Sequence, residues 1–181
     1  SLHDALPILQ SRYGGAGVQR LNQWLAMLQA QKDRPLQQQL PAVNTFWNRA
    51  VLQSEDSMLW SQPDYWATPL ERLGKGAGDC EDYVIGKYFS LLRLGVAVER
   101  LRLIYVRARL GGAGSTQSIA HMVLGYYETP AAEPLVLDSL LDNSGKGTLA
   151  AGGNLAVGAA VLDNRGGAVL HSGKGTADIV A

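Results

Sequence analysis

The chain contains a single cysteine, and it lies among carboxylates. The run Gly78-Asp79-Cys80-Glu81-Asp82 places three acids within two residues of the thiol. Negative charge nearby raises the pKa of a thiol and keeps it in the protonated, weakly nucleophilic form. Two interpretations are open at this point. Either Cys80 is an inert thiol, or a cation offsets the charge and Cys80 is a nucleophile.

The position of Cys80 in a predicted helix is compatible with both interpretations. The apolar spacing predicts a helix over residues 80–94, with Asp79 as its N-cap and Asp82 three residues later, as in a capping box. The first turn of a helix presents unpaired N–H groups and the positive end of the dipole, which lower the pKa of a thiol and can bind an oxyanion. Acids at a helix start beside a small buried thiol remain the structural alternative.

A cysteine nucleophile needs a histidine base and usually a group that orients the imidazole. His3 lies in the leader and His171 in the glycine-rich tail, so His121 is the histidine of the compact region. Asp138 follows 17 residues later, on the next predicted strand, and a hairpin would place it beside His121. A cysteine at a helix start, then a histidine and an aspartate on adjacent strands, is the order found in papain-like and transglutaminase-like enzymes. A structural histidine on a strand is the open alternative.

The order of predicted elements indicates an α+β domain over residues 16–141. Helices are predicted at 16–31, from about Pro41 onward, and at 80–94, with a long ordered loop over 61–78. Strands are predicted at 101–110, 119–127 and 134–140, the last two as an antiparallel hairpin.

The two ends of the chain differ from this domain. Residues 1–8 match the translation of a common sequencing adapter, so the leader 1–15 is expected to be non-native. In the tail, 142–181, glycine and alanine dominate, "SGKGT" occurs twice, and Leu-Asp-Asn recurs after 21 residues, at 141–143 and 162–164. Such repeats predict rungs of a parallel β-helix. The tail resembles hemagglutinin-type adhesin repeats, and we expect a chimeric joint near Leu141.

Bulk composition excludes several classes of protein. Acidic and basic residues balance at 16 each, which argues against a nucleic-acid partner. No apolar run of about 18 residues is present, so no membrane-spanning helix is predicted. One cysteine cannot form an internal disulfide.

From about Leu21 to Leu140 the sequence resembles the bacterial transglutaminase-like cysteine proteinases, the LapG type of periplasmic adhesin protease. The resemblance rests on "DYWATPLERLGKGAGDCEDYVIGKYFSLLRLGV", "LRLIYVRARL", "AHMVLGYY" and "AEPLVLDSL". It implies a papain-like, transglutaminase-like fold with Cys80 as nucleophile, His121 as general base and acid, and Asp138 as the orienting carboxylate. Related folds place an aromatic N–H near the oxyanion, and Trp66 precedes the nucleophile in this way. We favour the interpretation of Trp66 as a core aromatic.

The resemblance also implies a calcium site beside the nucleophile. Asp79 and Glu81 match the essential acids of the family, and Asp82 is expected as a further ligand. Clustered carboxylates suit Ca²⁺, which takes about 6–8 oxygen ligands. A bound Ca²⁺ would offset the charge around Cys80.

The function implied by the resemblance is that of a calcium-dependent periplasmic cysteine endopeptidase. It would cleave a giant surface adhesin, release it and promote biofilm dispersal, and an inner-membrane cyclic-di-GMP receptor would sequester it. Two alternatives stay open. A transglutaminase-type acyl transferase would resolve the same thioester with an amine, and a non-enzymatic adhesin fragment would only bind.

Overall fold

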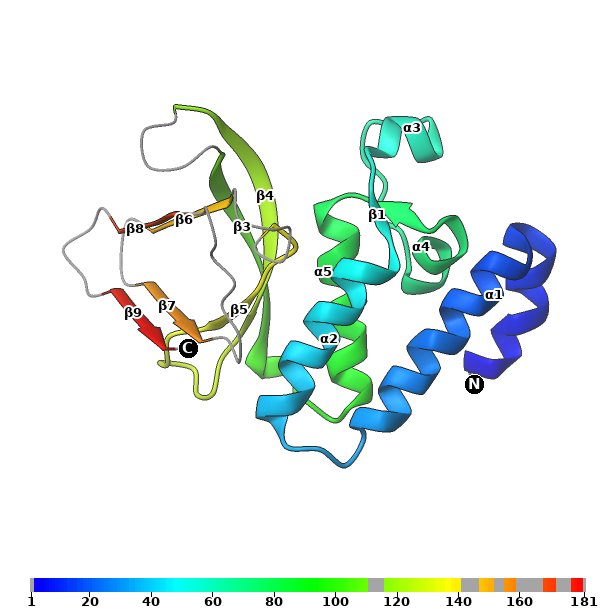
Figure 1. Cartoon of the computed structure of the whole chain (residues 1–181), viewed down its shortest axis with the longest axis horizontal. Helices are drawn as coiled ribbons and strands as arrows, with labels where there is room; N and C mark the ends of the chain where they lie inside the picture. Colours follow the sequence, from blue (N-terminus) through cyan, green and yellow to red (C-terminus); the bar gives the residue numbers. More distant parts are fainter. Residues whose placement is uncertain are drawn as a thin grey trace. The chain divides into compact units, whose positions relative to one another are not determined.

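The chain forms two compact units, one helical over Ser1–Gly95 and one rich in strands over Val96–Ala181 (Figure 1). The computed structural model describes residues 2–110, 116–140, 147–151, 155–158, 168–171 and 177–180. Within these residues, no helix combines the length and the apolar character needed to span a bilayer.

The helical unit confirms the helix predicted at Cys80 and extends the others. Asp79 is the N-cap of α5, and α5 ends before Gly95, whose φ of 90° favours glycine. The first long helix, α1, begins ten residues before the predicted start. A break at Gly14, where φ is 69°, separates its first turns from the rest. The helical spacing of apolar residues in the sequence is therefore regular only after Gly14. The elements are η1 (Leu2–Ala5), α1 (Leu6–Gln31), α2 (Leu36–Ala50), β1 (Leu52–Gln53), α3 (Asp56–Trp60), α4 (Pro69–Lys75), β2 (Ala77–Gly78) and α5 (Cys80–Arg93).

Two predictions about this unit are wrong. The second helix, α2, begins at Leu36 after Pro35 and contains Pro41 in its interior, so Pro41 does not open it. The predicted loop over 61–78 contains α4. A full capping box starts this helix: Thr68 Oγ1 accepts a hydrogen bond from the Glu71 N–H at 3.3 Å, and Glu71 accepts one from the Thr68 N–H at 2.9 Å.

A buried serine joins three helices of this unit. Ser90 on α5 accepts hydrogen bonds from the indole N–H groups of Trp24 on α1 and Trp47 on α2, at 2.8 and 2.9 Å, and donates one to the Gly86 carbonyl at 2.7 Å. The two indoles meet edge to face, with ring centroids 5.6 Å apart. A Cβ at Gly86 would lie 2.6 Å from the Trp47 ring, so glycine is needed there for α2 and α5 to approach. These contacts fix α5, the helix that carries Cys80.

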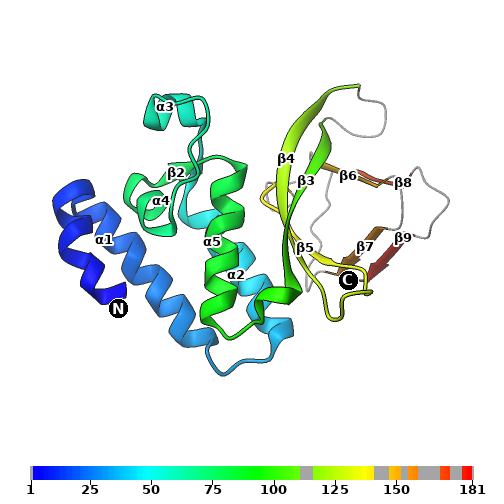
Figure 2. The same ribbon diagram turned by 180° about the vertical axis from the view of Figure 1, so that it is seen from behind.

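The second unit is built on an antiparallel meander, in agreement with the predicted strands (Figure 2). Strand β3 has the predicted bounds, and β4 and β5 form the predicted antiparallel pair, with Leu124 opposite Leu137. The order of the larger sheet is β5-β4-β3-β6-β8. The elements are η2 (Val98–Arg100), β3 (Leu101–Leu110), β4 (Ser118–Tyr126), β5 (Leu135–Leu137), β6 (Gly147–Ala151), β7 (Leu155–Gly158), β8 (Ala168–His171) and β9 (Ala177–Val180).

In the described residues of the tail, the strands pair in parallel, but their arrangement in two sheets does not show the predicted β-helix. Thr148 of β6 pairs with Ala168 of β8, and Leu155 of β7 pairs with Ala177 of β9. These offsets of 20 and 22 residues bracket the sequence period of 21. However, β6 and β8 extend the sheet of β3, whereas β7 and β9 form a sheet of their own. The Leu-Asp-Asn triplets and the expected joint at Leu141 lie outside the described residues. The mixed architecture agrees with a transglutaminase-like α+β fold.

Candidate active site

Cys80 occupies the first position of α5. The Asp79 side chain caps the helix by accepting a hydrogen bond from the Asp82 N–H at 3.5 Å. The half-buried Cys80 thiol donates a hydrogen bond to Glu81 Oε2 at 2.9 Å. Only the protonated thiol can donate such a bond, because the shared proton stays on the sulfur.

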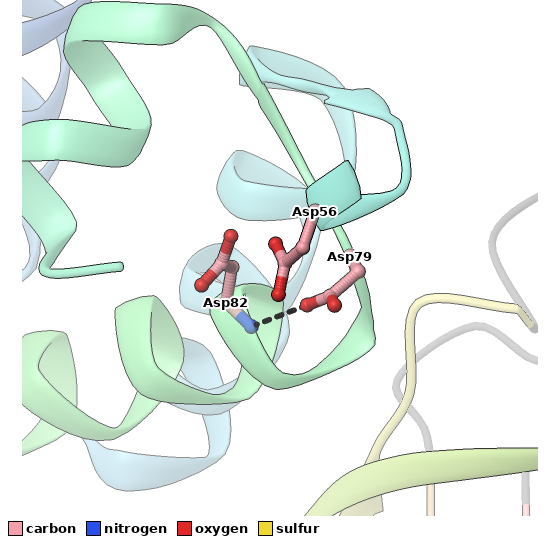
Figure 3. Close-up of side chains that lie close together, drawn as sticks. All are labelled: Asp56, Asp79 and Asp82. Carbon is pink, nitrogen blue, oxygen red and sulfur yellow. Dashed lines mark hydrogen bonds between the residues drawn. The ribbon is translucent and has the colours of Figure 1, made fainter. Parts of the chain in front are cut away.

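Three aspartates gather at the start of this helix. Carboxylate oxygens of Asp56, Asp79 and Asp82 all lie within 4.8 Å of one another (Figure 3). Among the described residues, this is the group of three or more acids whose oxygens lie close enough together to share one ion. Glu81 is not in the group, although it accepts from the adjacent Cys80 thiol, and its role as a ligand stays a prediction.

Asp56 is the member that sequence reasoning missed. It opens the short helix α3 and is 3% exposed. Its Oδ2 accepts a hydrogen bond from the Tyr65 N–H at 2.5 Å, whereas its buried Oδ1 has no hydrogen-bond partner. Parallel pairing of β1 with β2, with Gln53 opposite Gly78, brings the start of α3 to the start of α5. No local motif around Asp56 points to this contact.

The clustered carboxylates raise one another's pKa values. The pKa of Asp79 is raised to about 8, first by burial and then by the charges of Glu81, Asp82 and Asp56. Burial also raises the pKa of Asp82, to about 6, although the Arg72 guanidinium and the Ala67 N–H oppose that shift. At neutral pH the group therefore retains protons that a cation could replace.

The donor set fits a hard divalent cation. Three carboxylates converge, one buried oxygen lacks a partner, and burial disfavours leaving these groups ionised without a counter-ion. Both carboxylate oxygens of Asp82 already accept hydrogen bonds within the protein. Its Oδ2 accepts from Arg72 Nη1 at 3.2 Å, and its Oδ1 accepts from the Ala67 N–H at 2.8 Å. Asp56 therefore has an oxygen without a hydrogen-bond partner that could bind an ion, whereas both oxygens of Asp82 accept hydrogen bonds.

In the second unit, the structure brings His121 and Asp138 together. Nε2 of His121 lies 2.7 Å from Oδ1 of Asp138, and both side chains are buried. The strand register explains this proximity. Extending the pairing of β4 with β5 by one step puts Asp138 opposite Val123, two residues from His121 and on the same face. The same Asp138 oxygen accepts a hydrogen bond from the Leu140 N–H at 2.9 Å.

This pairing defines what the imidazole can do. A carboxylate that accepts the Nε2 proton fixes the ring and selects the tautomer in which Nδ1 is the acceptor. Nδ1 is then the nitrogen available to take up and return a proton. Strand pairing thus places a carboxylate against the imidazole, as the predicted hairpin indicated, and the roles of the two residues as general base and orienting group stay a prediction.

Trp66 is 49% exposed, so the interpretation of this residue as a core aromatic is wrong. Its two neighbours explain the exposure. The Tyr65 N–H binds Asp56 and the Ala67 N–H binds Asp82, which fixes the backbone on both sides of Trp66. The loop is therefore ordered by its backbone contacts to the carboxylates, without burial of the indole.

Comparison with known proteins gives consistent matches. Residues 21–142 match the family model described as bacterial transglutaminase-like cysteine proteinase. Among solved structures, Legionella pneumophila LapG is similar at 39% sequence identity, with a TM-score of 0.63 and 77% of this chain covered. The match covers 71% of the LapG chain in an EGTA-treated structure and 73% in a calcium-bound one. No curated protein matches the chain.

Proposed function

The chain belongs to the bacterial transglutaminase-like cysteine proteinases, and we propose that it hydrolyses a peptide bond with Cys80, His121 and Asp138 as its catalytic residues. The observation that carries the proposal is the buried 2.7 Å contact between His121 Nε2 and Asp138 Oδ1. Cys80 at the first position of α5 supplies the matching nucleophile.

In the acylation half of the proposed reaction, Nδ1 of His121 accepts the Cys80 proton and the thiolate attacks the peptide carbonyl. Backbone N–H groups at the N-terminus of a helix suit the oxyanion of the tetrahedral intermediate, and Cys80 lies at the start of α5. His121 then gives the proton to the leaving amine as the C–N bond breaks. The products of this half are a free amine and a thioester on Cys80.

The deacylation half reuses the same residues. His121 takes a proton from water, and the resulting hydroxide attacks the thioester carbonyl. The C–S bond breaks, the acid is released, and the proton returns to the sulfur. Asp138 stays ionised throughout and stabilises the imidazolium that forms twice in each cycle.

The proposal includes a Ca²⁺ site at the start of α5. Asp56 and Asp79 would hold the ion, with Asp82 and Glu81 as further acids of the site. Support comes from the unpartnered buried oxygen of Asp56 and from the calcium-bound LapG structure. Bound Ca²⁺ would supply positive charge beside the thiol, which favours the thiolate.

We extend the proposal to the biological setting that the family resemblance implies. The substrate is a large surface adhesin, cleavage releases it and promotes biofilm dispersal, and the enzyme works in the periplasm. An inner-membrane cyclic-di-GMP receptor is the proposed inhibitory partner. Cell fractionation of the native host would test the location, and co-purification with the receptor at high and low cyclic-di-GMP would test the partner.

The activity is tested by incubating the full chain with an N-terminal adhesin fragment in Ca²⁺, with and without a primary amine. Hydrolysis predicts two fragments whose masses sum to that of the substrate plus one water. A fragment that carries the added amine would instead identify the acyl transferase. An intact substrate, together with slow alkylation of Cys80 at neutral pH, would support the non-enzymatic alternative.

A further inference from the structure

We propose that Arg72 is a positioning residue for the nucleophile, an internal cation that fixes the first turn of α5 independently of any bound metal. The inference rests on the proposed function, because it assigns a role in aligning the Cys80 thiol. Its evidence lies entirely within the helical unit.

Arg72 is completely buried, at 0% exposure, on the α4 helix. Its Nη1 donates to the side chain of Asp82 at 3.2 Å and to the backbone carbonyl of Asp79 at 3.3 Å. These two acceptors flank Cys80, one on the residue before it and one two residues after it. A single guanidinium nitrogen therefore holds both sides of the nucleophile.

The surroundings of the guanidinium hold it in one place. Its central carbon lies 3.8 Å from the centroid of the Tyr83 ring, and the Tyr83 hydroxyl donates to the Val51 carbonyl at 2.9 Å. A Cβ at Gly78 would lie 1.7 Å from Arg72 Nη1, so only glycine leaves room for the guanidinium beside β2. Glycine two residues before the cysteine therefore has a physical reason in this chain.

The arrangement extends beyond α5 through Asp82. The other oxygen of Asp82 accepts the Ala67 N–H at 2.8 Å, so the ion pair links α4, the first turn of α5 and the loop that carries Trp66. Burying an arginine and an aspartate costs desolvation energy that a surface pair would avoid, and such a pair need not add stability. A positioning role explains why the site retains it.

A lysine would keep the charge but lose this geometry. The planar guanidinium lies 3.8 Å from the centroid of the Tyr83 ring while its Nη1 reaches both acceptors, whereas an ammonium is a compact, strongly hydrated charge that stacks poorly on a ring. Arg72→Lys therefore keeps the positive charge but loses the guanidinium geometry, so its effect reports on how the first turn of α5 is positioned. If the first turn of α5 loses its alignment, the Cys80 thiol and the adjacent backbone N–H groups no longer keep a fixed position relative to each other.

The test measures the rate of alkylation of Cys80 by iodoacetamide in the full chain, in saturating Ca²⁺, at a fixed neutral pH. Cys80 is the only thiol in the sequence, so the rate reports on one group. For Arg72→Lys we expect an alkylation rate about tenfold lower, because the displaced first turn no longer holds the thiol in place. In the cleavage assay, kcat should fall by a similar factor with little change in KM.

Arg20→Lys is the matched control. Arg20 also donates to backbone carbonyls of the α4 segment, those of Leu73 and Gly74, and both of these acceptors lie outside α5. We expect Arg20→Lys to lower the melting temperature while its alkylation rate stays within about twofold of the unsubstituted protein. Equal slowing by both variants would reduce Arg72 to a stabilising residue and overturn the proposal.

Gly78→Ala covers the case in which Arg72→Lys does not fold. It retains both charges and displaces the guanidinium by steric contact, so it should slow alkylation in the same way. A folded Arg72→Lys or Gly78→Ala protein with an unchanged alkylation rate would also overturn the proposal. Alkylation does not depend on proteolysis. A protein that cleaves no adhesin but shows the expected alkylation rates would therefore contradict the proposed function and leave the role of Arg72 standing.

Discussion

The start of α5 and the β4–β5 pair differ in how their charges are balanced. His121 and Asp138 satisfy each other at 2.7 Å, and the backbone N–H of Leu140 supplies a further hydrogen bond. At the start of α5, Asp56, Asp79 and Asp82 converge, and the buried cation Arg72 forms an ion pair with Asp82. The proposed orienting pair is therefore matched within the protein, whereas the acids near Cys80 outnumber the cation that pairs with them. This difference predicts which perturbations each region tolerates.

The largest expected effect comes from removing the reacting groups. Cys80→Ala and His121→Ala should each lower kcat for adhesin cleavage by roughly 10⁴-fold or more, since the two act as one unit. Circular dichroism should show intact folds. Wild-type turnover by Cys80→Ala would exclude this residue as the nucleophile.

Asp138→Asn should be severe but less complete, with kcat reduced by roughly 10²–10⁴-fold. An amide in place of the carboxylate no longer stabilises the imidazolium and can select the other tautomer. Alkylation of Cys80 in this variant should keep its dependence on Ca²⁺, because the acids around α5 are unchanged. Loss of that dependence would show that the two regions are not separable in this way.

Calcium removal should act on the α5 region. Chelation should lower activity. Compared with the protein at free Ca²⁺ of about 100 times Kd, the chelated protein should have a free energy of unfolding lower by about 2.7 kcal/mol. Mg²⁺ should rescue poorly because it requires tighter octahedral geometry. Asp56→Asn should weaken Ca²⁺ binding in calorimetry, whereas the exposed Asp64→Ala serves as a control without effect. Unchanged affinity in Asp56→Asn would remove Asp56 from the site.

The pH dependence of stability should distinguish the calcium-free from the calcium-loaded protein. The folded-state pKa values of Asp79 and Asp82, about 8 and about 6, lie above the ordinary aspartate value of 3.8. At a pH between the unfolded and folded pKa values, the folded state then binds more protons than the unfolded state. The free energy of unfolding of the calcium-free protein should therefore fall as pH rises from about 4 to 8. Ca²⁺ binding to ionised carboxylates should flatten this slope. Parallel melting curves against pH, with and without Ca²⁺, would contradict the prediction.

The smallest effect concerns the start of α4, which carries Arg72. Thr68→Ala removes the capping hydrogen bonds to Glu71 and should cost about 1 kcal/mol. Thr68→Ser, which keeps the hydroxyl, is the control and should lie close to the unsubstituted protein. Chemical denaturation measures both. A loss with serine equal to that with alanine would assign the effect to the missing methyl group.

Local signals in the sequence account for what could be predicted. The N-cap Asp79 and the apolar spacing after it define α5, and alternation defines β3 and β4. Hairpin geometry then places Asp138 beside His121 without knowledge of the rest of the fold. The capping box of α4 was missed, because the interpretation of residues 61–78 as a loop rested on their prolines and glycines and left the Thr-x-x-Glu spacing of "TPLE" unused.

Long-range contacts account for what could not be predicted. Asp56 reaches Asp79 because two-residue strands, β1 and β2, pair in parallel, and strands so short have no recognisable pattern. The burial of Arg72 is equally nonlocal, since an arginine in a polar loop segment carries no sign of its partners. The exposure of Trp66 follows from backbone contacts on either side, which side-chain hydrophobicity does not encode.

The tryptophan pair bridged by Ser90 allows the packing of the helical unit to be followed by fluorescence and circular dichroism. All four tryptophans of the chain lie before Gly95, so indole emission originates in this unit alone. Trp24 and Trp47, buried and edge to face, should emit at short wavelength and give a strong near-ultraviolet dichroic signal, whereas Trp66 should emit at longer wavelength. Ser90 lies ten residues after Cys80, about 15 Å along the helix axis. Quenching of the long-wavelength component alone would therefore reveal a ligand beside Trp66 while the paired indoles report that α5 stays packed.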